Sequence, residues 1–254
     1  MTKTSYFEHG KQYILSDYRN AKVSTLKFTD FLELNKCFDI NDGEVIADMG
    51  AGGASGLYHM AKSFPNAEFC GIDYNKPLVD WVNNTLWRKT SELCLSSMSL
   101  IYGDWTRPDE ISNNLKPKRI KGVLSVHSLC TQKNFKDAAL SLIKLNPNWI
   151  AFNSLFYDGP LDVLIHIRDH ESDLADDNPN ADFNIHSIPA AKEFMKTYNY
   201  TLSKNEPFDI GQVLHRPENL KRGTYTIQTE WSKYTQFSGP VFLPWHFLLF
   251  RKNT

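Results

Sequence analysis

A glycine-rich turn follows the first apolar run of the chain, and its residue types suit the binding of a nucleotide-like ligand. The turn reads Asp48-Met49-Gly50-Ala51-Gly52 and comes directly after Val45-Ile46-Ala47. Glycine has no Cβ, so the backbone at Gly50 and Gly52 can come close to a bound molecule. Asp73 closes the next apolar run, and a carboxylate at a strand end can receive the hydroxyls of a ribose. Strand, glycine turn, helix, strand and terminal carboxylate are typical of one half of a nucleotide-binding α/β domain.

The details of this turn bear on which adenosine cofactor it binds. In the dinucleotide fingerprint GxGxxG the third glycine packs helix against strand, but here that position is Ser55, and Gly56 comes one residue later. Asp48 precedes the first glycine by two residues, where its negative charge disfavours a pyrophosphate. The same carboxylate suits a ligand with an ammonium group, such as S-adenosylmethionine, which has no phosphate. An NAD-binding domain is the alternative.

Three histidines are candidates for a general base. His127 ends the fourth apolar run, and a histidine that merely packs or caps there is the competing interpretation. His166 and His170 are four residues apart, so in a helix they would share one face and could meet a substrate or a metal. We rank His170 first as the base, His166 second and His127 third.

Carboxylates surround the pair of histidines at 166 and 170, and oxygen-rich clusters can bind magnesium. A solvated acidic loop is the favoured interpretation of this segment, and we assign no metal ligand. The carboxylates are Asp169, Glu171, Asp173, Asp176 and Asp177.

The elements that must position these residues alternate between strand and helix from residue 45 onward. Alternation at this spacing predicts a parallel sheet with helices on both faces. A later helix is expected over Ser187–Tyr200, with Ser187 as its cap. The predicted strands are Val45–Asp48, Glu68–Asp73, Ser99–Gly103, Gly122–His127 and Trp149–Phe156, and the helices between them include Pro77–Arg88 and Phe135–Leu145.

Both ends of the chain and one long segment depart from this alternation. Residues 1–40 predict a helical N-terminal extension whose aromatic residues either cover a cofactor pocket or pack onto the core. Residues 157–190 form an insertion rich in Asp, Asn and His, and we expect it to form the substrate site, because long connections in compact domains are usually functional. Gly223–Trp231 and Val241–Arg251 predict antiparallel strands appended to the parallel sheet. We expect a single domain over residues 1–254.

The bulk composition limits the classes of partner. A chain of 254 residues with 41% hydrophobic and 22% charged residues can bury a full core. The net charge of −1 argues against broad capture of nucleic acid or of an anionic membrane. Four widely separated cysteines favour buried reduced thiols over zinc or disulfides. The chain has no apolar signal core and no run near the roughly 20 apolar residues that span a bilayer, so we expect a cytoplasmic protein.

Four motifs, in this order, resemble those of the class I S-adenosylmethionine-dependent methyltransferases. Asp48-Met49-Gly50-Ala51-Gly52 is similar to the first motif, and Gly71-Ile72-Asp73-Tyr74 is similar to the second. Tyr102-Gly103-Asp104-Trp105 is similar to the third, and Val123-Leu124-Ser125-Val126-His127 lies where the fourth strand of the family opens beside the methyl group. The resemblance covers roughly residues 40 to 160, with Phe247-Leu248-Leu249-Phe250 similar to the final antiparallel strand. Ala54 departs from the pattern, since many members have a third glycine there.

The resemblance implies S-adenosyl-L-methionine as the cofactor and a Rossmann-like fold, with a mostly parallel seven-stranded sheet and an antiparallel C-terminal strand. It implies that Asp73 receives the ribose hydroxyls, that Asp104 meets the adenine amino group and that Trp105 covers the adenine ring. The expected cofactor-binding residues are Asp48, Gly50, Gly52, Asp73, Tyr74, Asp104, Trp105 and Val126.

The expected reaction is methyl transfer to a hydroxyl or amine of a small molecule, with a sugar or a secondary metabolite as the favoured acceptor. Ser125-Val126-His127-Ser128 stands where enzymes that methylate base amino groups have an Asn-Pro-Pro-Tyr-type motif, which disfavours DNA. The alternatives are a methyltransferase acting on protein or RNA, an NAD-dependent oxidoreductase and a non-catalytic adenosine-binding module. A homodimer is left open.

Overall fold

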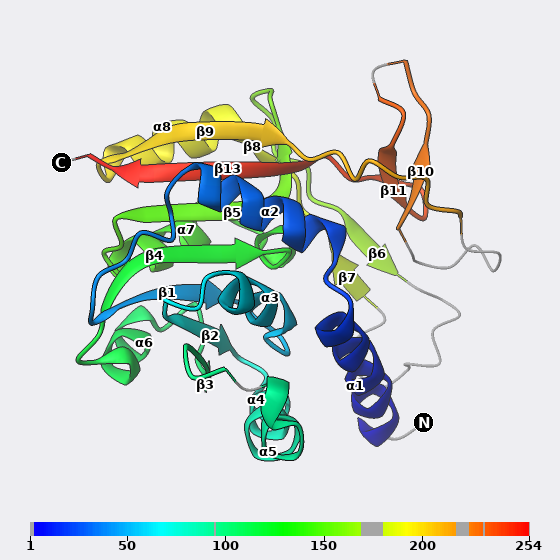
Figure 1. Ribbon diagram of the computed structural model, residues 1–254. Helices are drawn as coiled ribbons and strands as arrows, with labels where there is room; N and C mark the ends of the chain where they lie inside the picture. Colours follow the sequence, from blue (N-terminus) through cyan, green and yellow to red (C-terminus); the bar gives the residue numbers. More distant parts are fainter. Residues whose placement is uncertain (1–2, 94, 169–179, 217–223, 231, 254) are drawn as a thin grey trace.

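One large sheet forms the centre of the molecule (Figure 1). The computed structural model describes residues 3–93, 95–168, 180–216, 224–230 and 232–253. Seven strands follow one another in the order β3-β2-β1-β4-β5-β13-β9, and a short strand, β8, also pairs with β5. β13 runs antiparallel to both of its neighbours, whereas the other pairs are parallel. These strands are β1 (Glu44–Met49), β2 (Phe69–Asp73), β3 (Met98–Tyr102), β4 (Arg119–Val126), β5 (Trp149–Tyr157), β8 (His186–Ser187), β9 (Tyr200–Pro207) and β13 (Trp245–Lys252).

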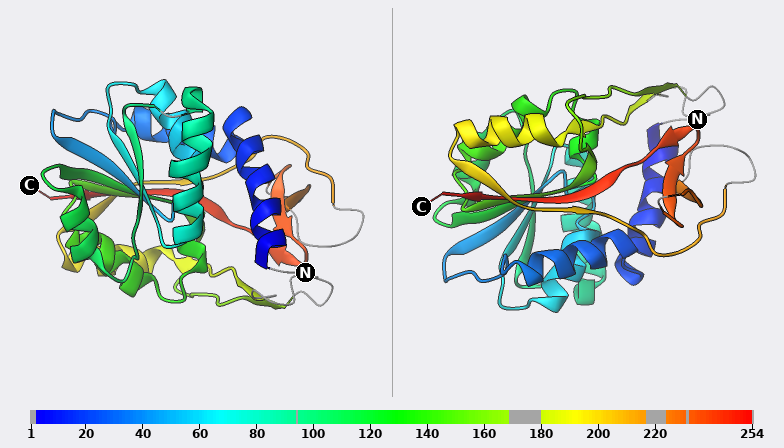
Figure 2. Two further views of the ribbon diagram at one scale, coloured as in Figure 1. Left: turned by 90° about the horizontal axis from the view of Figure 1, so that it is seen from below. Right: turned by 90° about the horizontal axis from the view of Figure 1, so that it is seen from above.

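Helices cover both faces of this sheet, which gives three layers (Figure 2). One core lies between the sheet and α2, α3 and the α4–α5 segment, and a second lies between the sheet and α6, α7 and α8. Since both faces are covered, β1 and β2 are buried along their whole length, and their residues are apolar or glycine except for Glu44, Asp48 and Asp73. The helices are α1 (Lys3–Arg19), α2 (Val23–Leu34), α3 (Ser55–Ser63), α4 (Lys76–Trp81), the π-helical turn η1 (Val82–Leu86), α5 (Trp87–Lys89), the 3₁₀ turns η2 (Ser91–Leu93) and η3 (Leu129–Thr131), α6 (Pro108–Leu115), α7 (Phe135–Lys144) and α8 (Ile188–Thr197).

The sequence-based predictions for this central unit are confirmed. All five predicted strands coincide with β1 to β5 within a few residues, and the predicted antiparallel C-terminal strand is β13. The stretch Pro77–Arg88 is helical throughout, as α4, η1 and α5. Ser187 caps α8 as expected, because its Oγ accepts a hydrogen bond from the Ala190 N–H at 3.2 Å. β8 is a short strand that the sequence did not predict.

Two small sheets lie outside the central one. β10 (Thr224–Ile227), β11 (Thr235–Ser238) and β12 (Val241–Phe242) form a separate antiparallel sheet. The prediction that Gly223–Trp231 extends the parallel sheet is therefore wrong: in the part of the chain that the structure describes, the strand paired with this stretch is β11. Within residues 157–190, β6 (His166–Arg168) and β7 (Asn180–Asp182) form a two-stranded antiparallel pair.

The N-terminal extension is helical, as predicted, and the described cysteines are buried. α1 and α2 account for most of residues 1–40. Cys37, Cys70 and Cys130 are free thiols, as expected, while Cys94 lies outside the described residues. No helix in the described ranges is both long enough and apolar enough to cross a membrane.

Candidate functional site

The glycine-rich loop between β1 and α3 contains three residues in the left-handed backbone region: Gly50, Gly52 and Ala54. Gly50 has a φ of 80° and Gly52 a φ of 55°, conformations that residues with a Cβ rarely adopt. The Gly50 and Ala51 N–H groups donate to the Ile72 carbonyl at 2.8 and 3.1 Å, which holds the loop against β2. A Cβ on Gly50 would lie 2.6 Å from the Cβ of Ser128, so only glycine fits where this loop meets the segment after β4.

Asp73, at the end of β2, holds the loop from the other side. Its Oδ2 accepts a hydrogen bond from the Gly52 N–H at 2.8 Å, and its Oδ1 accepts one from the Asn75 N–H at 2.9 Å. The residue is buried. Because each carboxylate oxygen can accept more than one hydrogen bond, Asp73 can hold the loop and still receive a ligand hydroxyl.

Asp48, near the end of β1, is a buried carboxylate, and one of its two oxygens accepts no hydrogen bond from the described residues. This oxygen is Oδ1. Burial, followed by the negative charge of Asp73, raises the pKa of Asp48 to about 7, although a hydrogen bond with the Val126 backbone opposes the shift. A cation beside Oδ1 would stabilise the ionised form, so the environment of Asp48 suits a positively charged group.

The other predicted cofactor contacts come from the ends of β2, β3 and β4. Tyr74 is 73% exposed, so its ring is open to a ligand. Asp104 follows β3 and accepts a backbone hydrogen bond at 2.8 Å, and the buried Trp105 places its Nε1 3.7 Å from the position that a Cβ on Gly50 would occupy. Val126 ends β4. Since β1 to β4 are parallel, all these residues meet at the carboxyl edge of the sheet, where open α/β sheets bind ligands.

Helix α1 packs directly against the glycine-rich loop. The Tyr18 hydroxyl donates to the Gly53 carbonyl at 2.8 Å and accepts a hydrogen bond from Trp87 Nε1 at 3.0 Å. Ile14 is so close that a Cβ on Gly53 would lie 2.7 Å from its Cγ2. Tyr18 therefore packs into the core, as one of the two interpretations of the N-terminal aromatic residues expected, and also contacts the loop.

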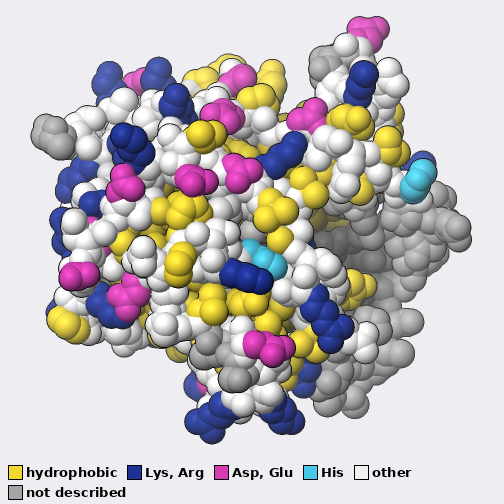
Figure 3. Space-filling model, in the orientation of Figure 1, with side chains coloured by type: hydrophobic (Ala, Val, Ile, Leu, Met, Phe, Trp, Pro, Cys, Tyr) yellow, Lys and Arg dark blue, Asp and Glu magenta, His cyan; other side chains and the backbone are white. Residues whose placement is uncertain are grey.

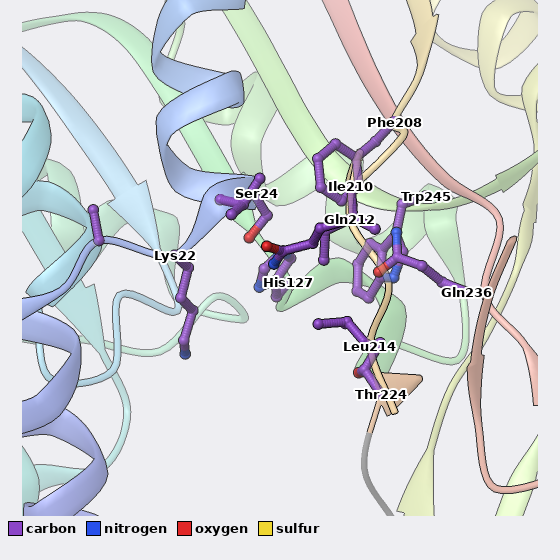
Figure 4. A pocket seen from close by; sticks show the side chains of 12 residues that line it. Lys22, Ser24, His127, Phe208, Ile210, Gln212, Leu214, Thr224, Gln236 and Trp245 are labelled. Atoms are coloured by element: carbon purple, nitrogen blue, oxygen red, sulfur yellow. The ribbon is translucent and has the colours of Figure 1, made fainter. Parts of the chain in front are cut away.

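A cavity of about 470 Å³ opens beside the end of β4 (Figure 4). Its walls come from the loop between α1 and α2, from His127, from the segment after β9 and from β10, β11 and β13. Small-molecule sites commonly have volumes of about 300–1,000 Å³, so one small ligand fits. The lining residues are Ala21, Lys22, Val23, Ser24, His127, Phe208, Ile210, Gln212, Leu214, Thr224, Gln236 and Trp245.

His127 is the predicted base that borders this cavity. Its ring packs against that of Trp245, with 4.7 Å between the centroids, and its backbone has a φ of 58°. Such a conformation is uncommon for a residue with a side chain and is found at functional sites. Burial, followed by the positive charge of Lys22, lowers the pKa of His127 to about 4. At neutral pH the imidazole is therefore uncharged and resists protonation.

The predicted helical pairing of His166 with His170 is wrong. His166 lies in strand β6, and its Nδ1 is 2.9 Å from Oδ1 of Asp182 in the neighbouring strand β7. Its side chain is 62% exposed. His170 lies outside the described residues, as do the five carboxylates expected around it. Among the residues that the structure does describe, no three His, Cys, Asp or Glu side chains are grouped to hold a metal ion, and no member of 157–190 lines the cavity beside His127.

Sequence reasoning missed most of the cavity lining. Residues such as Lys22, Phe208 and Gln212 are far apart in the chain and share no motif, so the sequence holds no signal that joins them. Asn153 did carry a signal, since it interrupts the apolar run of β5 opposite Val126. Both polar atoms of its side chain are buried without a hydrogen-bond partner in the described residues, which makes Asn153 a further candidate for a ligand contact.

Comparison with known proteins identifies similar structures but no similar sequence. No protein-family model matches the chain, and no curated protein matches it. The Burkholderia thailandensis 1,6-didemethyltoxoflavin-N1-methyltransferase is similar, with a TM-score of 0.56 and 11% identity over 100% of this chain and 92% of that one. The glycopeptide N-methyltransferase MtfA has a TM-score of 0.57 and 9% identity over 92% of this chain and 96% of its own.

A third similar structure is the complex of a Haloferax volcanii protein with the Trm112 methyltransferase activator, which has a TM-score of 0.54 and 10% identity over 96% of both chains. At these identities the likeness is one of fold. The strand order distinguishes this fold from a dinucleotide-binding domain. Such a domain has the all-parallel order 3-2-1-4-5-6, whereas here the antiparallel β13 lies between β5 and β9.

Proposed function

We propose that this chain, whose fold is that of the class I S-adenosylmethionine-dependent methyltransferases, transfers a methyl group to a hydroxyl or amine of a small molecule. The observation that carries the proposal is the buried carboxylate of Asp48, whose Oδ1 has no donor in the described residues. The positive charge and the N–H groups of a methionine ammonium would satisfy that oxygen. The pyrophosphate of NAD would instead be repelled by it.

The residues around Asp48 fit the rest of this cofactor. Gly50 and Gly52 leave the loop backbone open to a ligand, and Asp73 can accept the ribose hydroxyls. Tyr74 offers exposed aromatic surface for adenine and Asp104 is an acceptor for its amino group, whereas Trp105 is buried among core residues. When bound, S-adenosylmethionine supplies a methyl group on a positively charged sulfur, which keeps the electron pair as the carbon–sulfur bond breaks. This chain contributes binding and orientation of the reactants.

The cavity beside His127 is the candidate acceptor site, in place of the insertion at 157–190. His127 follows β4 directly, and Ser128 contacts the glycine-rich loop, so the cavity adjoins the candidate cofactor site. Its volume of about 470 Å³ favours a small acceptor, such as a secondary metabolite or a sugar, over a protein or an RNA. Lys and Arg are interspersed with Asp and Glu on the face shown in Figure 3. This mixture of charges disfavours binding of a polyanion such as RNA to that face.

Calorimetric titration of three ligands tests the proposal. S-adenosylmethionine should bind and NAD should not. Asp48→Asn should weaken S-adenosylmethionine at least tenfold, because a charge-assisted hydrogen bond contributes about 1.5–3 kcal/mol. It should leave 5′-methylthioadenosine, which lacks the ammonium group, within about twofold. The exposed Asp109, replaced by Asn, is the matched control. Binding of NAD in preference to S-adenosylmethionine would overturn the assignment.

A second variant separates the ribose contact from the ammonium contact. Asp73→Ala should weaken both S-adenosylmethionine and 5′-methylthioadenosine by about tenfold or more, since both carry the ribose. A non-catalytic adenosine-binding module would bind both ligands in the same way. It would release no S-adenosylhomocysteine with any acceptor, and changes at His127 would have no effect on it.

A further inference from the structure

The charged lining of the cavity beside His127 comes from the loop between α1 and α2. Lys22, in the loop between α1 and α2, is the charged residue among the described residues that line it. The described polar groups on the other walls are uncharged: Ser24, Gln212, Thr224 and Gln236, together with the neutral His127. Lys22 pairs at 2.7 Å with Asp17, a residue of α1 that is not part of the described lining. The charged group that the described lining itself offers to a ligand is therefore the Lys22 ammonium, which Asp17 also contacts.

The rest of the lining is apolar and partly aromatic. The rings of Trp245 and Phe208, with Ile210 and Leu214, form a wall that suits a flat, unsaturated molecule. In Figure 4, Lys22 and Trp245 flank His127 from opposite sides. A ligand that places its ring against Trp245 can thus direct a polar group towards Lys22.

The surroundings of His127 make its imidazole a weak base. Its ring packs against Trp245, and the positive charge of Lys22 disfavours a second positive charge on the imidazole. A sugar hydroxyl needs a base to remove its proton during methylation, and a protonated amine needs one beforehand. A protonated amine would also be repelled by Lys22. An acceptor that arrives already ionised avoids both difficulties.

We propose that the acceptor is a small aromatic or conjugated molecule with an ionised oxygen, a carboxylate or an acidic hydroxyl, paired with Lys22. The inference rests on the proposed function: it keeps the methyl donor and the hydroxyl acceptors, adds carboxylates to them and excludes amines. The ionised oxygen uses a lone pair to form the oxygen–carbon bond while the carbon–sulfur bond breaks, the electron pair stays with sulfur and no proton is released. His127 then positions the acceptor as a neutral hydrogen-bonding group.

A matched series of probes tests this charge preference. The protein is saturated with S-adenosylhomocysteine, and 2-naphthoate, neutral 2-naphthamide and cationic 2-naphthylmethylamine are titrated by calorimetry. We expect 2-naphthoate to bind at least fivefold more tightly than the amide, and the amine to bind most weakly. Equal or tighter binding of the amide or amine, or no binding of 2-naphthoate at millimolar concentration, overturns the inference. Failure of S-adenosylhomocysteine itself to bind would instead overturn the proposed function.

Two variants at the ion pair should shift the affinity for 2-naphthoate in opposite directions. Lys22→Gln should weaken it about fivefold, which is the largest effect expected of an exposed ion pair, since the Lys22 side chain is 57% exposed. Asp17→Asn should strengthen it, because Lys22 is then free to pair with the ligand. Neither variant should change the affinity for 2-naphthamide by more than about twofold. Lys192→Gln, an exposed change on α8, is the control for net charge. Equal losses for naphthoate and naphthamide would show that Lys22 shapes the cavity without selecting charge.

Discussion

Asp48 should make the stability of the ligand-free protein fall with rising pH over a range in which most carboxylates have the opposite effect. Its pKa is about 7 in the folded chain, against 3.8 for an ordinary aspartate. Between these two values the folded chain holds a proton that the unfolded chain has lost. The free energy of unfolding should therefore decrease as pH rises from about 3.8 to about 7, and this contribution should be constant above and below that range.

The size of the effect follows from the shift. A difference of about 3 pKa units corresponds to about 4 kcal/mol, at 1.36 kcal/mol per unit. Asp48→Asn removes the titration but leaves a buried amide with unsatisfied groups, which costs about 1–3 kcal/mol at every pH. The variant should therefore be less stable than the wild type below pH 4 and more stable above pH 7, with a total change in the difference of about 4 kcal/mol.

Urea unfolding followed by tryptophan fluorescence, at several values between pH 4 and pH 8.5, measures this difference. Subtracting the wild-type curve from the variant curve cancels the titration of the other carboxylates, so the remaining pH dependence belongs to Asp48. The exposed Asp109→Asn should show no such dependence. If the wild-type and Asp48→Asn stabilities run parallel across the range, then Asp48 is not a desolvated carboxylate, and the proposed contact with an ammonium group is refuted with it.

Three further predictions concern the same loop. Binding of S-adenosylmethionine at pH 7 should release about half a proton, because the ammonium lowers a pKa that lies near 7; calorimetry in two buffers of different ionisation enthalpy measures this. Tyr18→Phe should lower the free energy of unfolding by about 1–3 kcal/mol in urea, since it leaves the Gly53 carbonyl and Trp87 Nε1 without their partner. Gly50→Ala should abolish cofactor binding while far-ultraviolet circular dichroism stays unchanged, because its Cβ would lie 2.6 Å from that of Ser128; full affinity in this variant would contradict the loop geometry.

The central sheet and the candidate cofactor site could be predicted from the sequence because their determinants are local. Strands buried on both faces are continuous apolar runs, and the helices between them show their own periodicity, so β1 to β5 are visible one by one. The candidate cofactor residues lie within a few positions of the strand ends. Because neighbouring parallel strands end at one edge, the order Asp48, Asp73, Asp104 along the chain becomes proximity in space.

The remaining parts depend on contacts between segments far apart in the chain. The alternation in β10 is equally compatible with the central sheet or with a separate one, and the decision rests on its pairing with β11. The spacing of His166 and His170 fits a helix, but the strand partner of His166 lies in β7, sixteen residues away. Neither partner can be identified from the periodicity of the segment itself.

The N-terminal segment joins the predictable half of the site to the half that was not predictable. Tyr18, in α1, holds the carbonyl of Gly53 in the glycine-rich loop, and Lys22, four residues later, lines the cavity beside His127. Asp17 connects the two positions, since it pairs with Lys22 and its carbonyl lies 2.7 Å from His59 Nε2 in α3. The end of α1 and the short loop after it thus connect the glycine-rich loop to the cavity. If a ligand moves the loop, α1 and Lys22 are the groups through which the candidate acceptor site would respond.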